Sequence, residues 1–329
     1  MKNRSRNLIA AASCMLGLLA VTQANSQPAW RPEKAVEIIT SSDAGGSNDR
    51  VARVMQKIIQ DEKLVSAPIV VVNKPGGNQT LAVAYLNQHA GDAHYLLLAN
   101  PTVFSNEIVG ITPQKYTDLS FVVNLLSEHT AFTVRADSTF KSMGDLFAKL
   151  KADPASISIG IVALGATNHL TLCSAARSAG VDPRKLKTPV FKTNADSMTA
   201  VLGGHLQLVA SSVSAVIEQV KAGNARMLAI AAPKRMTGAL ANVPTLRELG
   251  YDVELSSWRA VFGARGFTPA QIAFWEEVFA KMSATDAWKK DLANNDWAPS
   301  FMRSKEGAKY LANEYSVTRA VMSDLGLAK

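Results

Sequence analysis

Apolar and polar positions follow two alternating patterns along most of the chain. Short apolar runs without polar interruption predict strands covered on both faces, as in a parallel sheet. Between these runs, apolar residues recur with helical spacing; in 49–61, those sharing one face are Val51, Val54, Met55, Ile58 and Ile59. In the first third of the chain, these patterns therefore predict strands at Val36–Thr40, Ile69–Val72 and Tyr95–Ala99, and helices at 49–61 and 80–89.

The remainder of the chain continues this alternation. Extended segments are expected at 121–126, 131–134, 157–162, 206–210 and 227–231, and helices at 142–151, 168–178, 197–203 and 213–221. A long helical region opens at Phe267-Thr268-Pro269. The pattern predicts an α/β protein, and no internal repeat, low-complexity segment or flexible linker is evident.

The first 26 residues have the three parts of a secretory signal peptide. A basic start over 1–6 precedes an uncharged apolar run over 8–21, and Ala24 and Ser26 fit the small positions before a cleavage site after Ser26. The run is shorter than the roughly 20 apolar residues of a membrane span, and an uncleaved anchor is the alternative. Cys14 lies inside the run rather than after it, which argues against lipidation. We therefore expect an exported, periplasmic protein.

Length, charge and cysteine content further limit the domain organisation and the kind of protein that this chain can be. About 300 residues would remain after cleavage, which predicts two domains, and without a linker the chain is expected to cross between them through strands. The formal charge is +8, and removing the three basic residues of the signal leaves +5. The basic residues are scattered, unlike the clustered footprint of a nucleic-acid-binding protein, so no nucleic-acid partner is expected. Cys173 lies in a predicted helix and is interpreted as a buried thiol rather than a nucleophile.

The loop after the first predicted strand has the composition of a ligand-binding turn. It reads Ser41-Ser42-Asp43-Ala44-Gly45-Gly46-Ser47-Asn48-Asp49. Small residues let a ligand approach the backbone, and the free N–H groups and dipole of a helix start bind anions. Ser47 and Asn48 can also cap the helix. A glycine-rich turn without a ligand is the alternative.

A second loop has the same logic. The predicted strand at 157–162 leads into Ala163-Leu164-Gly165-Ala166-Thr167-Asn168-His169 and then a helix. Ligands of open α/β sheets bind beyond the carboxyl ends of the strands, so the two loops are expected to face each other across a cleft. His169 is expected either near the ligand or packed at the helix start.

Several segments in fixed order resemble a known family. They are Trp30–Lys34, Val36–Ile39, Ala44–Arg53, Val71–Gly76, Leu202–Gly204 and Asn242–Tyr251. Together they resemble the Bug family, the solute receptors of tripartite tricarboxylate transporters, over essentially the whole chain after the signal. The resemblance implies a type II periplasmic-binding-protein fold, in which two α/β domains close on a small carboxylate. It also implies that the two loops hold this carboxylate, partly through ordered water.

The departures from the family pattern bear on the ligand rather than the fold. Ser41 and Ser42 stand where the family usually has proline and an aromatic residue. Asp43 adds an acid, expected either to receive a ligand ammonium group or to point to solvent. The other departures are Asp92-Ala93-His94-Tyr95, Phe191-Lys192-Thr193 and Gln207. Aromatic acids, amino acids, dicarboxylates and tricarboxylates all remain open as ligands.

Enzyme signatures are weak in this chain. It has no G-x-S-x-G elbow and no phosphate-binding loop. Ser138-Thr139-Phe140-Lys141 has S-x-x-K spacing, but no K-T-G accompanies it. The histidines form neither H-x-x-x-H nor H-E-x-x-H, so we expect no metal site and no cofactor.

We therefore expect a monomeric binding protein that delivers one small organic carboxylate to two membrane subunits of a secondary transporter. Domain 1 is expected at 27–128 and 237–329 and domain 2 at 129–236, with crossings at 125–132 and 228–232. The alternatives are a sensor receptor for a membrane signalling protein and a periplasmic hydrolase. Arg259, beside Trp258, is expected either to bind a carboxylate or to form a surface salt bridge. The expected ligand-binding residues are Ser41, Ser42, Asp43, Ser47, Asn48, Asn100, Gly165, Ala166, Thr167, Asn168, His169, Asn194, Asp196, Ser211 and Trp258.

Overall fold

The structure is a computed structural model that describes residues 30–253 and 255–329. The predicted signal peptide at 1–26 lies outside the described residues, so its cleavage stays a prediction. The unit Arg31–Lys329 is described below.

Parallel strands form the first part of this unit. β1 (Val36–Thr40) pairs in parallel with β2 (Ile69–Asn73) on one side and β3 (Tyr95–Ala99) on the other. Ile38 and Ile39 point to opposite faces of β1 and both are buried, which confirms a strand covered on both faces. The helices of this part are α1 (Ser47–Asp61), α2 (Thr80–Asn87) and α3 (Thr102–Ile108), with 3₁₀ turns η1 (Gly77–Gln79) and η2 (Tyr116–Asp118).

One long strand replaces the two segments predicted at 121–126 and 131–134. β4 (Ser120–Arg135) has 16 residues. Over Ser120–His129 it pairs antiparallel with β8 (Ser256–Gly263), and β9 (Ala298–Arg303) pairs with this same part of the strand. From Thr130 onward it pairs antiparallel with β6 (Leu208–Ser212) and β7 (Ala225–Ile230). The sequence suggested two segments because polar residues interrupt the apolar run at 127–130.

The strand order in the described residues is β2-β1-β3-β8-β4-β6-β5, with β7 and β9 also paired to β4. β5 (Ile159–Gly160) pairs in parallel with β6 and is shorter than the predicted 157–162. Its neighbours Ser158 and Ile161 instead form isolated bridges, to Lys187 and Val190. Because β4 and β8 run antiparallel to their neighbours, the sheet is mixed, whereas a parallel sheet was expected. The other elements here are α4 (Met143–Ala152), α5 (Thr167–Ser178), α6 (Asn194–Leu202), α7 (Val213–Lys221), η3 (Pro183–Lys185) and η4 (Gly238–Leu240).

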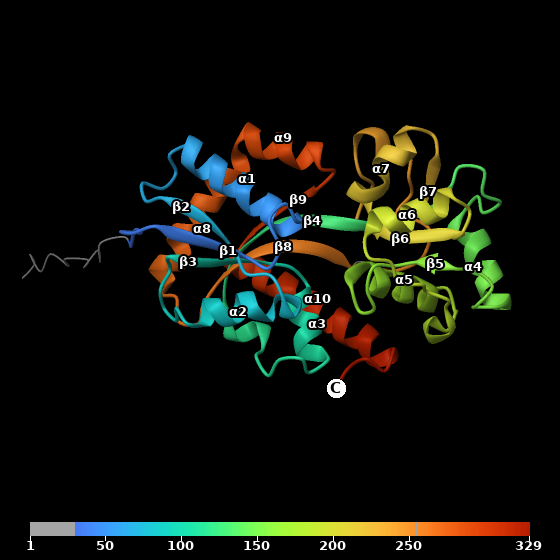
Figure 1. The fold of residues 1–329 in the computed structure, drawn as a ribbon, viewed down its shortest axis with the longest axis horizontal. Coiled ribbons are helices and arrows are strands. Elements are labelled where there is room, and N and C mark those ends of the chain that lie inside the picture. Colours follow the sequence, from blue (N-terminus) through green and yellow to red (C-terminus); the bar gives the residue numbers. More distant parts are fainter. Residues whose placement is uncertain (1–29, 254) are drawn as a thin grey trace, which may run out of the picture. The chain divides into compact units, whose positions relative to one another are not determined.

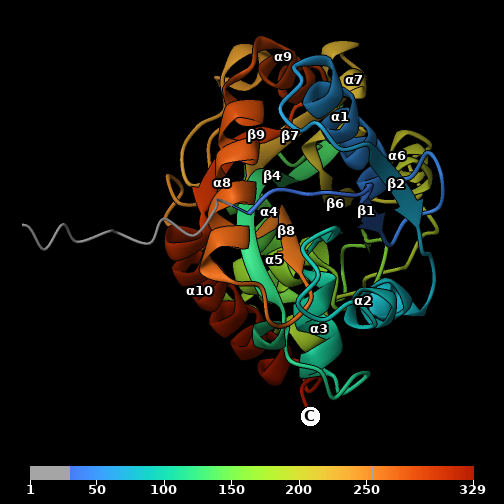
Figure 2. The same ribbon diagram turned by 90° about the vertical axis from the view of Figure 1, so that its left-hand side faces the viewer.

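The C-terminal region is helical, as predicted. α8 (Pro269–Ala284) begins with a capping box in which Thr268 and Gln271 satisfy each other's backbone N–H groups. α9 (Asp286–Asn294), β9 and α10 (Ser304–Asp324) follow. α10 packs against both α3 and α5 (Figures 1 and 2).

The strands divide this unit into two lobes. We call β1, β2, β3, β8, β9 and the Ser120–His129 part of β4, with their helices, the first lobe. We call β5, β6, β7 and the Thr130–Arg135 part of β4, with α4–α7, the second lobe. Figure 1 shows β4 running from one lobe into the other. Separate clusters of buried apolar side chains fill the lobes, one including Phe104 and Trp258 and another including Phe132 and Phe147. The fold is therefore α/β with two lobes.

Candidate functional site

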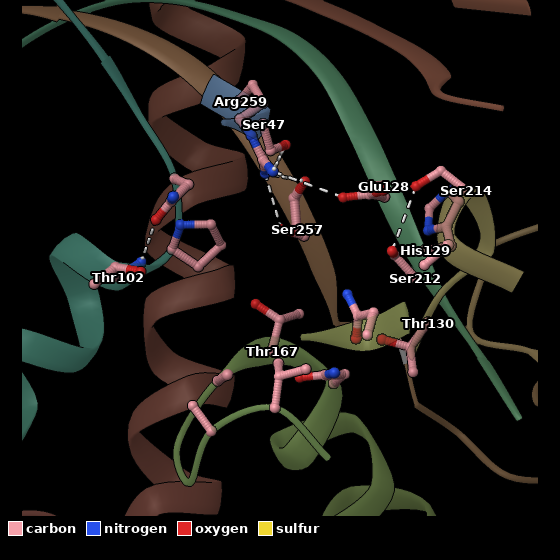
Figure 3. A pocket seen from close by; sticks show the side chains of 18 of the residues that line it. Ser47, Thr102, Glu128, His129, Thr130, Thr167, Ser212, Ser214, Ser257 and Arg259 are labelled. Carbon is pink, nitrogen blue, oxygen red and sulfur yellow. Dashed lines mark hydrogen bonds and ion pairs between the residues drawn. The ribbon is translucent and has the colours of Figure 1, made fainter. Parts of the chain in front are cut away.

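A pocket of about 680 Å³ lies where the two lobes meet. The first lobe contributes the start of α1, the β3–α3 turn and β8, and the second lobe contributes the β5–α5 loop and the start of α7. The middle of β4 lies between these contributions, with Glu128, His129 and Thr130 in the pocket wall. Figure 3 shows Arg259 and Thr167 on opposite sides of the pocket. The volume is in the usual range for small-molecule sites.

A buried carboxylate fixes the loop before α1. The N–H of Gly45, whose φ is +83°, donates to Asp49 Oδ2 at 2.8 Å. Arg53 Nε also donates to Oδ2 at 2.8 Å, and Asn73 Nδ2 donates to Oδ1 at 2.8 Å. Burial opposes ionisation of Asp49, but these three donors outweigh it, so the pKa of this carboxyl lies below its ordinary value. The loop is thus held from behind by an ionised side chain.

A neutral histidine fixes the loop before α5. The N–H of Gly165, whose φ is +76°, donates to His169 Nδ1 at 3.0 Å. Nδ1 must then be the acceptor, which places the ring proton on Nε2, 3.4 Å from Cys173 Sγ. Burial lowers the pKa of His169 to about 4 and raises the pKa of the Cys173 thiol to about 12. His169 therefore braces the loop, and Cys173 is an unreactive thiol.

The two loops share a five-residue pattern. Gly45-Gly46-Ser47-Asn48-Asp49 corresponds to Gly165-Ala166-Thr167-Asn168-His169. In both, the glycine N–H bonds the side chain four residues later, and the hydroxyl residue is the first of its helix. In both, that hydroxyl residue lines the pocket. No repeat is evident in the sequence, because the match is short and its last position has Asp in one loop and His in the other.

Seven of the sequence-predicted site residues line the pocket. They are Ser47, Asn100, Gly165, Ala166, Thr167, Asn168 and Asn194. Thr167 has its side chain directed into the cavity (Figure 3). The structure thus brings the starts of α1 and α5, which follow the two loops, to the same pocket. Their contact with a ligand stays a prediction.

The other eight predicted residues are not part of the pocket lining: Ser41, Ser42, Asp43, Asn48, His169, Asp196, Ser211 and Trp258. The side-chain amide of Asn48 donates to Ser41 Oγ at 3.4 Å, and its backbone N–H donates to Ser42 Oγ at 3.3 Å. Asp43 and Asp196 are exposed, while Ser211 is fully buried.

Trp258 is placed in the core instead of the cleft. Its side chain is 0% exposed and packs near Phe104 and Phe262. Alternate side chains of a strand face opposite ways, so its neighbours Ser257 and Arg259 face the pocket. Arg259 was already a candidate from the sequence, whereas Ser257 was not, because no strand was predicted over 256–263.

Arg259 is a buried cation in the pocket wall. Its Nη1 donates to the carbonyl and hydroxyl oxygens of Ser257, at 3.0 and 2.9 Å. Its Nη2 donates to Ser47 Oγ at 3.2 Å and lies 3.6 Å from Glu128 Oε2. Burial lowers the pKa of the Arg259 guanidinium, and the Glu128 carboxylate offsets part of that effect. The exposed salt bridge considered from the sequence is therefore a buried one.

Glu128 extends this network to the second lobe, and sequence reasoning had missed it. Its Oε1 accepts a hydrogen bond from the hydroxyl of Ser214 in α7. The neighbouring His129 is 7% exposed, and burial lowers its pKa to about 4. The ring is therefore neutral at neutral pH. No local motif marks Glu128, because its partners come from distant parts of the chain.

The rim of the pocket carries further charges. Arg50, Glu218 and Asp296 line it, and Lys221 Nζ pairs with Glu218 Oε1 at 2.9 Å. Burial raises the pKa of the Asp296 carboxyl, while Lys221 opposes that shift and Glu218 adds to it. Ser138, of the S-x-x-K match, is outside the pocket lining, and its hydroxyl accepts the Phe140 N–H at 3.2 Å.

The described part of the chain contains neither a metal-binding cluster nor a membrane-spanning helix. Within it, no group of three or more His, Cys, Asp and Glu side chains is arranged to hold a metal ion. In residues 30–253 and 255–329, no helix has the length and apolar character to cross a membrane.

Comparisons with known proteins give a consistent result. Residues 51–327 match the model of the tripartite tricarboxylate transporter family receptor. A Cupriavidus necator protein, the UPF0065 protein in the gbd 5′ region, is 30% identical, with 98% of this chain and 96% of that protein covered. The structure of a TctC solute-binding protein from Polaromonas superposes with a TM-score of 0.80 at 22% identity, covering 89% of this chain and 99% of that one. The structure of R. palustris Rpa4515 with adipate has a TM-score of 0.74 at 22% identity, covering 90% and 99%.

Proposed function

The chain belongs to the tripartite tricarboxylate transporter receptor family, and from that premise we propose that it captures a small organic carboxylate in the pocket between its lobes. The family and its structural neighbours are solute-binding receptors rather than enzymes. The proposed receptor then delivers its ligand to the membrane subunits of a transporter.

One observation carries the carboxylate assignment. Helices α1 and α5 begin at the pocket, one from each lobe, and each presents a hydroxyl residue, Ser47 and Thr167. Backbone N–H groups and dipoles at helix starts favour an anion without burying a second full charge. The structure of Rpa4515 with adipate supports the same class of ligand.

A comparison of acids with their amides tests this assignment. Succinate, adipate and benzoate are each compared with the corresponding amide by thermal unfolding, because a ligand that binds only the folded state raises the melting temperature. We expect at least one acid to raise it and its amide to leave it unchanged. Equal shifts for an acid and its amide would contradict an anion site.

We also propose that the lobes close on the ligand as domains, 27–128 with 237–329 and 129–236. The support is that β4 passes from one set of strands to the other near His129 and Thr130. Hinges of this kind absorb the motion at a few backbone torsions. Small-angle scattering is expected to show a smaller radius of gyration once ligand is added; an unchanged radius from an open ligand-free form would argue against closure.

Location and partners complete the proposal. The chain is exported through the segment at 1–26, works as a monomer in the periplasm and uses neither cofactor nor metal. N-terminal sequencing of the exported protein tests the cleavage after Ser26, and a product that retains Met1 would contradict it. Loss of uptake of the bound acid when the receptor is deleted separates a transporter partner from a sensor.

A further inference from the structure

The pocket wall formed by β4 presents hydrogen-bond acceptors. Glu128 Oε1 accepts from the Ser214 hydroxyl, and Oε2 has the Arg259 guanidinium at 3.6 Å, longer than a hydrogen bond. An ionised carboxylate has about four acceptor positions, so Glu128 retains unused acceptor capacity. In Figure 3 the Glu128 carboxylate lies beside the cavity, toward Arg259.

Two other side chains of the pocket lining each have a buried polar atom without a partner in the described structure. His129 is 7% exposed, and its Nδ1 has no hydrogen-bond partner. Asn194 Oδ1 is likewise buried without a partner.

The donors of Arg259, by contrast, are largely used by the protein. Nη1 bonds Ser257 and the Trp258 carbonyl, and Nη2 bonds Ser47. Two N–H groups remain: the second one of Nη2, which has Glu128 Oε2 at 3.6 Å, and that of Nε, which is buried without a partner in the described structure. Arg259 therefore holds Ser47 and partly compensates Glu128, and the Glu128 carboxylate keeps acceptor positions that no donor of the described structure fills.

The charges around the pocket also bear on the ligand. Three acids line it, Glu128, Glu218 and Asp296, together with two cations, Arg50 and Arg259, and Lys221 pairs with Glu218 from outside the lining. A ligand with two carboxylates would add two negative charges to this set, whereas an amino carboxylate would add none. Like charges in a confined site repel strongly because solvent screening is weak there.

We propose that the ligand is an amino carboxylate whose ammonium group donates to Glu128. Its carboxylate lies at the starts of α1 and α5, so this inference rests on the proposed function. The Asp43 side chain, considered from the sequence as a partner for an amine, is exposed and outside the pocket lining. Glu128 is then the residue that selects amino acids over simple acids.

Matched probes test the proposal on the unmodified protein. The pairs are L-alanine with propanoate, L-norvaline with pentanoate, L-phenylalanine with 3-phenylpropanoate and L-glutamate with glutarate, each measured by melting shift and calorimetry. We expect at least one amino acid to bind about tenfold or more tightly than its deaminated partner, as for one charge-assisted hydrogen bond. Acids that bind as tightly as their amino acids in every pair overturn this inference and leave the proposed function intact. If amines without a carboxylate bind as tightly as the amino acids, or if no probe binds, both this inference and the proposed function are overturned.

Glu128→Gln then assigns the preference to one residue. It keeps an oxygen for the Ser214 hydroxyl and removes the charge, so the best amino acid is expected to lose about tenfold while its deaminated partner binds equally well or better. Glu314→Gln is the control, since Glu314 is 3% exposed and lies outside the pocket lining. Equal losses for both probes in Glu128→Gln would show a structural role only. If that variant fails to fold, the comparison of pairs on the unmodified protein still decides the proposal.

Discussion

The loops before α1 and α5 hold a glycine in the same backbone conformation but fix it with different chemistry. Gly45 bonds an ionised carboxylate, Asp49, which also takes donors from Arg53 and Asn73. Gly165 bonds a neutral imidazole, His169, which is followed by Cys173. One loop thus depends on a charge and its partners, whereas the other depends on the absence of charge.

This difference predicts that the loops respond to acid in separate ranges. An imidazole that accepts a hydrogen bond through Nδ1 loses that capacity when it is protonated. A carboxylate whose pKa is lowered by its partners stays ionised at a pH where an ordinary aspartate would be protonated. The same loop geometry can therefore be held by two side chains that become protonated at different pH.

The largest expected effect is loss of stability between pH 6.5 and 4. The pKa of His169 is about 4 in the fold and about 6.5 in the unfolded chain, so the unfolded state binds more protons in this range and stability falls as the pH falls. The full contribution is about 3 kcal/mol, and His129, with the same folded pKa, adds a similar one. Denaturant unfolding across this range measures it. In His169→Gln the fall is expected to be about half as large, and an unchanged fall would contradict the role of His169.

Asp49→Ala tests the charged loop. It leaves the Gly45 N–H and the Asn73 amide without their acceptor, which is expected to lower the free energy of unfolding by about 2 kcal/mol. Arg53 is half-exposed and can turn to water, which limits the loss. Urea unfolding at pH 7 checks this value. Asp61→Asn, which removes an exposed pair with Lys57, is the control and is expected to change little.

Thr167→Val asks whether the neutral loop binds the ligand. The substitution keeps the shape and removes a hydroxyl that faces the pocket, so affinity for the bound acid is expected to fall about tenfold, with a similar melting temperature. Calorimetric titration gives the comparison. Ser138→Ala is expected to bind normally, because Ser138 lies outside the pocket lining. Normal binding by Thr167→Val with a loss in Ser138→Ala would reverse the assignment.

Alanine at the two loop glycines gives the smallest effect. Gly45 and Gly165 have positive φ, at +83° and +76°, so Gly45→Ala and Gly165→Ala should each cost about 1 kcal/mol. An added methyl group at Gly45 meets no atom within 4 Å, and at Gly165 it meets Met322 Cε at 3.4 Å, so Gly165→Ala should cost slightly more. Gly144→Ala, within α4, is expected to stabilise by about 0.5–1 kcal/mol. Thermal unfolding of the three variants checks the signs, and a gain at Gly45 would contradict the strained backbone.

Local patterns in the sequence determined most elements and both pocket loops. The strand Tyr95–Ala99 and the helix Val213–Lys221 have the predicted bounds, and Ser47 and Thr167, one from each predicted loop, line the pocket. These features depend on residues near one another in the chain: apolar spacing, turn glycines and helix starts. The local pattern did not show that 121–126 and 131–134 are one strand, because polar residues lie between them, and three of these, Glu128, His129 and Thr130, line the pocket.

Only the tertiary structure decided which side chains share the pocket. Arg259 bonds Ser47 across 212 positions of sequence, and Glu128 takes its hydrogen bond from Ser214 across 86. Asp43 and Trp258 were plausible by composition, yet one is exposed and the other is in the core. Spacing along a chain encodes contacts within an element, whereas the direction of a side chain between two lobes depends on how distant strands pair and pack.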